Sequence, residues 1–154
     1  MRLYLTVHVP DHRKALSGLL LADHNLAEVR LRYQERHQPP VPREWRLCRL
    51  CGDGIEEPLH ALFLCTNSPT LVNLRAAFFD NCGIDPSNLQ HLTPLGILHQ
   101  MILDEKLVSK FAKFCYLVLQ LYDTFPMLVP AREWFSEVPN ETADRRLHSL
   151  DVML

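Results

Sequence analysis

Hydrophobic residues recur at intervals of three and four along much of this chain, which is the period of one face of an α-helix. The clearest stretch begins at Asp104 and predicts the longest helix. Its apolar stripe would form the spine of the core, and its members are Leu107, Phe111, Phe114, Val118, Tyr122 and Phe125. Pro126 and Pro130 follow, and proline ends helices, so we expect the helix to stop there.

Two helices are predicted before residue 38. Asp11 is expected to cap the first, in which Ala15 and Leu16 begin the apolar stripe, and Asp23 is expected to cap the second. The inner stripe of the second helix would consist of Leu26, Val29 and Tyr33. The segment 38–42, with the sequence QPPVP, contains too much proline to be helical and predicts a stiff connector.

Two Ser/Thr–Pro pairs mark helix starts in the second half of the chain. Ser68 and Thr93 are each followed by proline, and this order suits an N-cap residue and the first helical position. The first of these helices should end in the stretch NCGIDPSN. With only 5 glycines and 11 prolines, the chain is expected to be helical with proline breaks.

Four residues with metal-ligand side chains lie in the window CRLCGDGIEEPLHALFLC. They are Cys48, Cys51, His60 and Cys65, with the spacing C-x2-C-x8-H-x4-C. Three thiolates and one imidazole complete a tetrahedral zinc shell and leave no open position. The window therefore predicts one structural Zn²⁺, with no catalytic role.

The local sequence agrees with this ligand set. Gly52 permits a tight turn after the first two cysteines, and Pro58 suits the first turn of a short helix that would carry His60. Cys65 would be about 140° further round an ideal helix, so we expect it where the last turn loosens. A redox interpretation of Cys48 and Cys51 would need a βαβ unit, which the flanking sequence does not supply.

These elements predict an all-α fold, a helical bundle with a zinc-bound loop or short helix between two helical halves. The expected parts are N-terminal helices and connector (1–42), the zinc segment (43–66), a C-terminal helical part (67–130) and a tail, helical or disordered (131–154). They should form one compact domain, since 154 residues suffice for one sizeable core. Cys115 is expected in the core and Cys82 as a free thiol.

Charge is unevenly distributed along the chain. Residues 1–50 hold nine Lys/Arg against five Asp/Glu, and residues 51–154 hold seven against thirteen. The basic residues close to the zinc window are predicted nucleic-acid contacts, namely Arg32, Arg36, Arg43, Arg46 and Arg49. The alternative is a solvated helix face.

Two further choices stay open at this level. Arg43, Arg46 and Arg49 could offset the negative charge of the metal centre instead of contacting phosphates. Trp45 could stack on an unpaired base or anchor the core beside the zinc segment. We favour the core for Trp45.

The zinc spacing, together with HRKALSGLLLADHNLAEVRLRYQERHQPPVPREWRLCRLC before it, resembles the C-terminal region of non-LTR (LINE-type) retrotransposon reverse transcriptases, fungal ones above all. The family's leucine-rich run ending in a small residue and His corresponds to the run up to Ala22 and His24, and its E…H…L…C helix to residues 57–65. The resemblance covers roughly residues 11–125. It implies a Cys-Cys-His-Cys zinc segment after the polymerase thumb, and a role in template recognition.

The chain departs from that family at the polymerase site. Reverse transcriptases hold two catalytic metals with paired aspartates in a Y-x-D-D turn, but the nearest string, 121–124, holds one carboxylate. We therefore expect a C-terminal fragment that is not an enzyme, lies inside the cell (in nucleus or cytoplasm) and has no membrane association. Its expected partners are RNA or DNA, bound with low selectivity, and the remainder of a reverse transcriptase. The alternatives are a zinc-stabilised protein-interaction module without nucleic-acid affinity and a pseudogene product.

Overall fold

The structure, a computed structural model, describes residues 2–33, 40–131 and 133. The described residues are mostly helical and contain no β-strand, so the predicted all-α fold is confirmed. The helices are η1 (Leu3–Thr6), α1 (Pro10–Leu20), α2 (Ala27–Arg30), η2 (Arg43–Trp45), η3 (His60–Leu64), α3 (Pro69–Cys82), η4 (Pro86–Leu89), α4 (Pro94–Leu103) and α5 (Val108–Asp123). The tail predicted over 131–154 lies outside the described residues, apart from 131 and 133.

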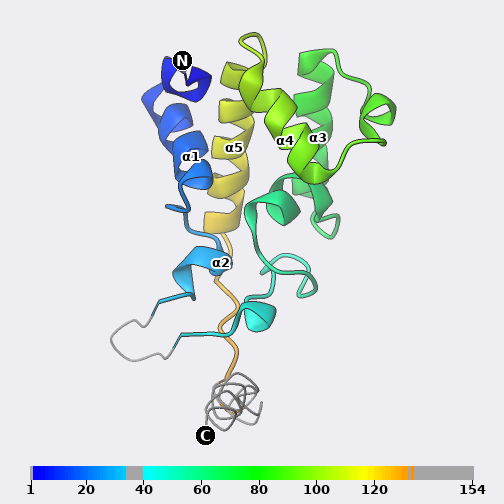
Figure 1. Cartoon of the computed structure of the whole chain (residues 1–154). Helices are drawn as coiled ribbons and strands as arrows, with labels where there is room; N and C mark the ends of the chain where they lie inside the picture. Colours follow the sequence, from blue (N-terminus) through cyan, green and yellow to red (C-terminus); the bar gives the residue numbers. More distant parts are fainter. Residues whose placement is uncertain (1, 34–39, 132, 134–154) are drawn as a thin grey trace, which may run out of the picture.

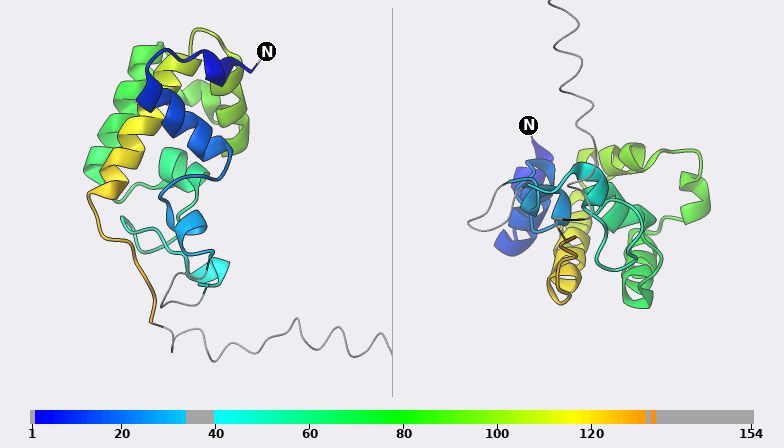
Figure 2. Two further views of the ribbon diagram at one scale, coloured as in Figure 1. Left: turned by 90° about the vertical axis from the view of Figure 1, so that its left-hand side faces the viewer. Right: turned by 90° about the horizontal axis from the view of Figure 1, so that it is seen from below.

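Helix α5 is the centre of the molecule. It packs against α1 on one side and α3 on the other, and α4 crosses in front of the α3–α5 pair (Figure 1). The side view places α3 and α4 on opposite sides of α5 (Figure 2). Helix η2 and α2 lie below this bundle, beyond the C-terminal end of α5 (Figure 1), while η3 packs against α5.

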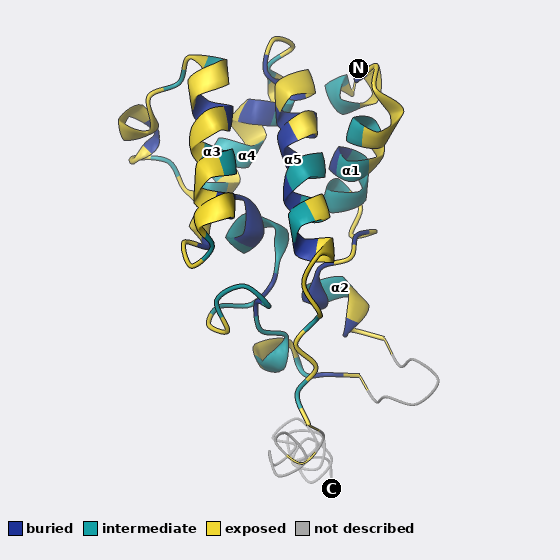
Figure 3. Ribbon diagram, turned by 180° about the vertical axis from the view of Figure 1, so that it is seen from behind, coloured by how far each residue is buried: buried dark blue, intermediate teal, exposed yellow. Residues whose placement is uncertain are grey.

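The predicted spine of α5 faces the core as expected over most of its length. Phe111 is fully buried, and Phe114 stacks on Phe78 of α3 with ring centroids 4.6 Å apart. Buried side chains line the inner faces of α5 and α3, while their outer faces are exposed (Figure 3). The last member of the predicted stripe differs, because Phe125 lies beyond the end of the helix and is 44% exposed.

Side-chain caps explain two of the helix starts. The hydroxyl of Ser68 accepts a hydrogen bond from the Leu71 amide, and the hydroxyl of Thr93 accepts one from the Gly96 amide at 3.1 Å. Both predictions of a cap followed by proline are confirmed. Helix α3 ends at Gly83, which has a φ of +66° and so adopts the left-handed conformation typical of a helix C-terminus.

Two other predicted starts were wrong. Helix α1 begins at Pro10, so Asp11 lies in its first turn instead of capping it. Helix α5 begins at Val108 because the Asp104 side chain accepts a hydrogen bond from the Lys106 amide and closes a turn before the helix. Pro10 marks the start of α1, and the turn closed by Asp104 precedes the start of α5. The hydrophobic period alone did not locate either start.

The predicted second helix is also shorter than expected. Among residues 23–33 only Ala27–Arg30 are helical, and they form the single turn α2, whose N-cap is Leu26 instead of Asp23. Tyr33 is 64% exposed and is not part of an inner stripe. The amide of Ala27 donates to the buried carboxylate of Glu56 at 2.8 Å, so a contact with a distant segment fixes where α2 starts.

A second, smaller apolar cluster lies at the end of the molecule that holds α2. Its buried members are Ala27, Leu31 and Val41, and Trp45 and Met127 pack against them. Trp45 therefore anchors a core, as favoured from the sequence. No helix in the described part of the chain is long and apolar enough to cross a membrane.

Candidate metal centre

Cys48 and Cys51 lie on a tight turn between two short extended segments. Leu47 and Ile55 form an isolated antiparallel bridge, and the Cys48 amide donates to the Gly54 carbonyl at 2.9 Å. Gly52 closes the turn with a φ of +68°, as its position predicts, and its amide donates to the Cys48 carbonyl. This geometry brings both thiols to the same side of the loop.

His60 and Cys65 lie at the two ends of η3, which is one turn of π-helix. The Cys65 amide donates to the His60 carbonyl at 2.9 Å, an i→i+5 hydrogen bond. In an α-helix the two side chains would diverge by about 140°, and the wider turn reduces this angle. The expected loosening of the last turn is thus a π-turn that aligns two ligands.

The four side chains converge. Their ligand atoms all lie within 4.8 Å of one another. The sulfur atoms of Cys48 and Cys65 are 3.9 Å apart, and Nε2 of His60 is 3.4 Å from the sulfur of Cys51. Metal–ligand bonds of about 2.3 Å to sulfur and about 2.0 Å to nitrogen give tetrahedral edges of roughly 3.5–3.8 Å. The group can therefore hold one metal ion.

The protonation of the three thiols differs. Burial alone would raise the pKa of Cys48, but hydrogen bonds from His60, Tyr122 and two backbone amides outweigh it and lower that pKa to about 6. Burial raises the pKa of Cys51 to about 12 and also raises the pKa of Cys65. The lowered pKa favours the thiolate at Cys48, and metal binding would release protons from the two thiols whose pKa is raised.

Tyr122 connects the cluster to the central helix. Its hydroxyl lies 3.3 Å from the sulfur of Cys48, and its side chain is 1% exposed. A thiolate at Cys48, which the lowered pKa favours, would accept from this hydroxyl. The hydrophobic period predicted Tyr122 as part of the apolar stripe of α5. No signal in the sequence indicated that its hydroxyl also contacts a candidate metal ligand.

Arg75 of α3 supports the other end of the cluster. Its guanidinium donates to the carbonyl of Leu62 at 2.7 Å and to that of Cys65 at 2.9 Å. These carbonyls belong to the π-turn, where the regular helix pattern leaves them without partners. Sequence reasoning missed this residue, because it lies ten residues after the last ligand, outside the conspicuous window.

Glu56 and Arg49 form a buried ion pair behind the metal-binding turn. The side chain of Glu56 is 0% exposed and that of Arg49 is 4% exposed, with 2.7 Å between Oε1 and Nη2. The carboxylate also accepts from the Arg49 and Ala27 amides, while the guanidinium donates to the carbonyls of Asn25, Tyr122 and Phe125. The pair therefore joins the metal segment to the α1–α2 connection and to the end of α5.

Sequence reasoning assigned Arg49 to phosphate contacts or to the metal charge. Instead, the guanidinium of Arg49 is used in internal contacts, none of them with a ligand sulfur in the described structure. The burial of a glutamate can be predicted only when its arginine partner is known. The sequence around Glu56 does not identify Arg49 as that partner.

The other predicted nucleic-acid residues that the structure describes lie closer to solvent. Arg46 donates to the Val41 and Glu28 carbonyls, and exposed Arg43 pairs with Glu57 at 2.6 Å. Arg32 is exposed and lies over the ring of Tyr33. Arg36 lies outside the described residues.

The remaining two cysteines are separate from the cluster. Cys115 is fully buried in α5, as expected, and burial raises its pKa. Cys82 is half-buried at the end of α3 and forms no disulfide. The described residues contain no βαβ unit around Cys48 and Cys51, so the context needed for the redox interpretation is missing there.

Comparison with known proteins finds no matching family model, no matching curated protein and no matching solved structure.

Proposed function

We propose that this chain is a zinc-bound helical interaction module. The observation that carries the proposal is the convergence of Cys48, Cys51, His60 and Cys65, whose ligand atoms all lie within 4.8 Å. A set of three sulfurs and one nitrogen favours zinc among common biological divalent cations. Four protein ligands fill a tetrahedron, so the ion would be structural and would leave no position for a substrate.

The surroundings of the cluster support a structural role. Tyr122 belongs to α5, Arg75 belongs to α3, and the Glu56–Arg49 pair reaches the α1–α2 connection. Metal binding would therefore fix the position of segment 43–66 against three separate parts of the molecule. The energy of the metal–ligand bonds would add to the free energy of folding.

The contacts of the arginines favour a protein partner over nucleic acid. Arg49 is buried in an ion pair, Arg46 donates to two backbone carbonyls, and Arg43 is paired with a glutamate. A phosphate would have to compete with each of these contacts. We also propose, from the sequence resemblance, that the module derives from the C-terminal region of a non-LTR retrotransposon reverse transcriptase.

Nucleic-acid binding is a second candidate, and one observation favours it. Burial is the main cause that lowers the pKa of Arg46. The positive charges of Arg32 and, to a smaller extent, Arg43 lie close enough to lower it further. Three guanidinium groups thus share one end of the molecule. Binding of single-stranded RNA that weakens with salt, and that Arg32→Gln/Arg43→Gln abolishes without unfolding, would establish this candidate over the protein-interaction role.

Metal analysis tests the leading proposal. We expect about one zinc per chain after purification without added metal. Co²⁺ substitution should give the absorption bands of a tetrahedral site with three sulfurs, and Cys51→Ser should weaken them. Cys82→Ser is the matched control and should change neither metal content nor spectrum. A metal-free protein whose melting temperature is unchanged by zinc or by chelator would refute the proposal.

A further inference from the structure

The face of the bundle opposite α4 carries a groove between α3 and α5. Its volume is about 440 Å³. The α3 wall presents residues at positions 74, 77, 78 and 81, and the α5 wall presents positions 110, 113, 114 and 117. Both sets follow the i, i+3, i+4, i+7 pattern of one helix face, so each wall is about two turns long.

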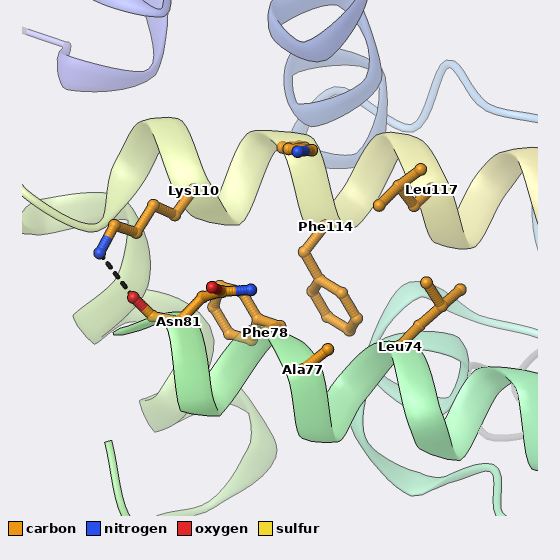
Figure 4. A pocket seen from close by; sticks show the side chains of 8 residues that line it. Leu74, Ala77, Phe78, Asn81, Lys110, Phe114 and Leu117 are labelled. Carbon is orange, nitrogen blue, oxygen red and sulfur yellow. Dashed lines mark hydrogen bonds between the residues drawn. The ribbon is translucent and has the colours of Figure 1, made fainter. Parts of the chain in front are cut away.

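The floor of the groove is apolar. It consists of the stacked rings of Phe78 and Phe114, which are 5% and 3% exposed and whose planes are 13° apart. Leu74 and Leu117, both half-buried, form one end of the groove, and exposed Ala77 leaves space above the floor (Figure 4). The small side chain at position 77 is what keeps the centre of the groove open.

The charged residues that line the groove have a single sign. Lys110 lies at the other end, Lys113 lies next to Phe114 along α5, and no acidic residue is among the lining residues (Figure 4). The ammonium of Lys110 donates to the Asn81 backbone carbonyl at 2.7 Å, which fixes one positive charge at the end of α3 (Figure 4). Lys113 is exposed and has no hydrogen bond or ion pair with the described residues.

We propose that this groove binds an acidic amphipathic helix of a partner protein. The apolar face of such a helix would contact the Phe78–Phe114 floor, and its carboxylates would reach Lys110 and Lys113. Helix-in-groove binding uses apolar residues at the same i, i+3, i+4, i+7 spacing as the groove walls. The docked helix would cover the α3–α5 pair on the face opposite α4 (Figure 3). This inference rests on the proposed interaction function and names its partner class.

A displayed library of helical peptides of about 18 residues, which is about five turns, provides the probe. Leucines are fixed at the i, i+3, i+4 and i+7 positions, and the remaining positions vary among Glu, Lys, Gln and Ala. Selection on the zinc-loaded protein should enrich peptides of negative net charge. An enriched peptide and its Glu→Lys counterpart are then synthesised and titrated by fluorescence anisotropy.

Three variants separate shape from charge. Lys110→Glu/Lys113→Glu should weaken binding of the acidic peptide roughly tenfold, since each exposed pair contributes modestly and reversal adds repulsion. Ala77→Arg retains the positive charge but fills the groove, and should abolish binding. Lys106→Glu changes an exposed lysine outside the groove and should leave binding within about twofold.

Zinc content and melting curves of the same preparations separate failure of this inference from failure of the proposed function. A zinc-loaded, folded protein that enriches no acidic helix overturns this inference alone. Enrichment of basic peptides, or binding that Ala77→Arg leaves intact, also overturns it. Self-association lost in Ala77→Arg would assign the groove to a second copy of the chain. Poly(U) RNA binding lost in the double lysine variant would assign it to nucleic acid, and either result contradicts the acidic-helix partner.

Discussion

In the helical bundle the buried side chains are almost all apolar, and aromatic rings of α3 and α5 stack in its centre. In segment 43–66 the buried set is small and includes the charged side chain of Glu56 and two candidate metal ligands, Cys48 and Cys65. Apolar burial is non-directional and tolerates adjustment. Metal bonds and buried ion pairs are directional and fail when one partner is lost. The two regions should therefore respond differently to the same disturbances.

Metal removal should give the largest difference between the two regions. Zinc binding to small zinc-dependent folds contributes on the order of 10 kcal/mol. A chelator should therefore expose the amides of segment 43–66 to hydrogen exchange, while those of α5 between Phe111 and Val118 stay protected. Residue-resolved hydrogen exchange with and without chelator measures this. Equal loss of protection in both regions would mean that the bundle depends on metal as much as the loop does.

The Glu56–Arg49 pair should rank next. Glu56→Gln leaves the Arg49 guanidinium, 4% exposed, without a counter-charge, and breaking a buried pair costs about 3–5 kcal/mol. Urea unfolding of the zinc-loaded protein measures the change in free energy.

Glu57→Gln provides the matched control for that substitution. Glu57 pairs with Arg43, whose side chain is 55% exposed, so the change should cost less than about 1 kcal/mol. Similar losses of unfolding free energy in the two variants would show that the buried Glu56–Arg49 pair stabilises the fold no more than the exposed Glu57–Arg43 pair does.

The contrast between the regions also explains what the sequence could predict. Caps such as Ser68 and ligands such as Cys48 act over a few residues, so adjacent sequence identifies them. The apolar stripe of α5 was equally visible, because periodicity reports one buried face. The fold class and the ligand set followed from these local signals.

Several of the missed polar contacts join residues distant in sequence. Glu56 accepts from Ala27, and that contact fixes the start of α2 at Ala27 instead of directly after Asp23. The Tyr122 hydroxyl contacts the sulfur of Cys48 across 74 positions, and Arg75 reaches back to the π-turn. Long-range polar contacts leave no period or spacing in one sequence, so structure was needed to find them.

Raising the pH should distinguish core thiols from ligand thiols. Burial raises the pKa of Cys115 above its ordinary value of 9.0, so the folded state keeps the proton that the unfolded state loses. The stability from this thiol is present below about pH 9 and falls by about 1.4 kcal/mol per pH unit above it. Cys115→Ala should therefore lose stability less steeply than the unchanged protein between about pH 8 and pH 11.

Urea titrations of the two zinc-loaded proteins at each pH measure that slope, and ligand ionisation cancels in the difference. Parallel pH profiles would mean that Cys115 loses its proton as easily in the fold as in the unfolded chain, contrary to its burial in α5.

The smallest effects should come from two glycines of the metal-binding turn, which test whether the turn or the ligand is the sensitive element. At Gly52 an added Cβ meets nothing within 4 Å, but the φ of +68° disfavours a side chain. Gly52→Ala should therefore cost about 1–2 kcal/mol of stability and leave the Co²⁺ spectrum unchanged.

At Gly54 an added Cβ lies 2.8 Å from Nδ1 of His60. Gly54→Ala should therefore displace the imidazole, shift the spectrum and weaken metal binding roughly tenfold, as changes beside metal ligands do. Competition with a chromophoric chelator measures that affinity. A spectrum altered by Gly52→Ala but not by Gly54→Ala would reverse the assignment, because the metal centre would then depend on the backbone of the turn more than on the position of His60.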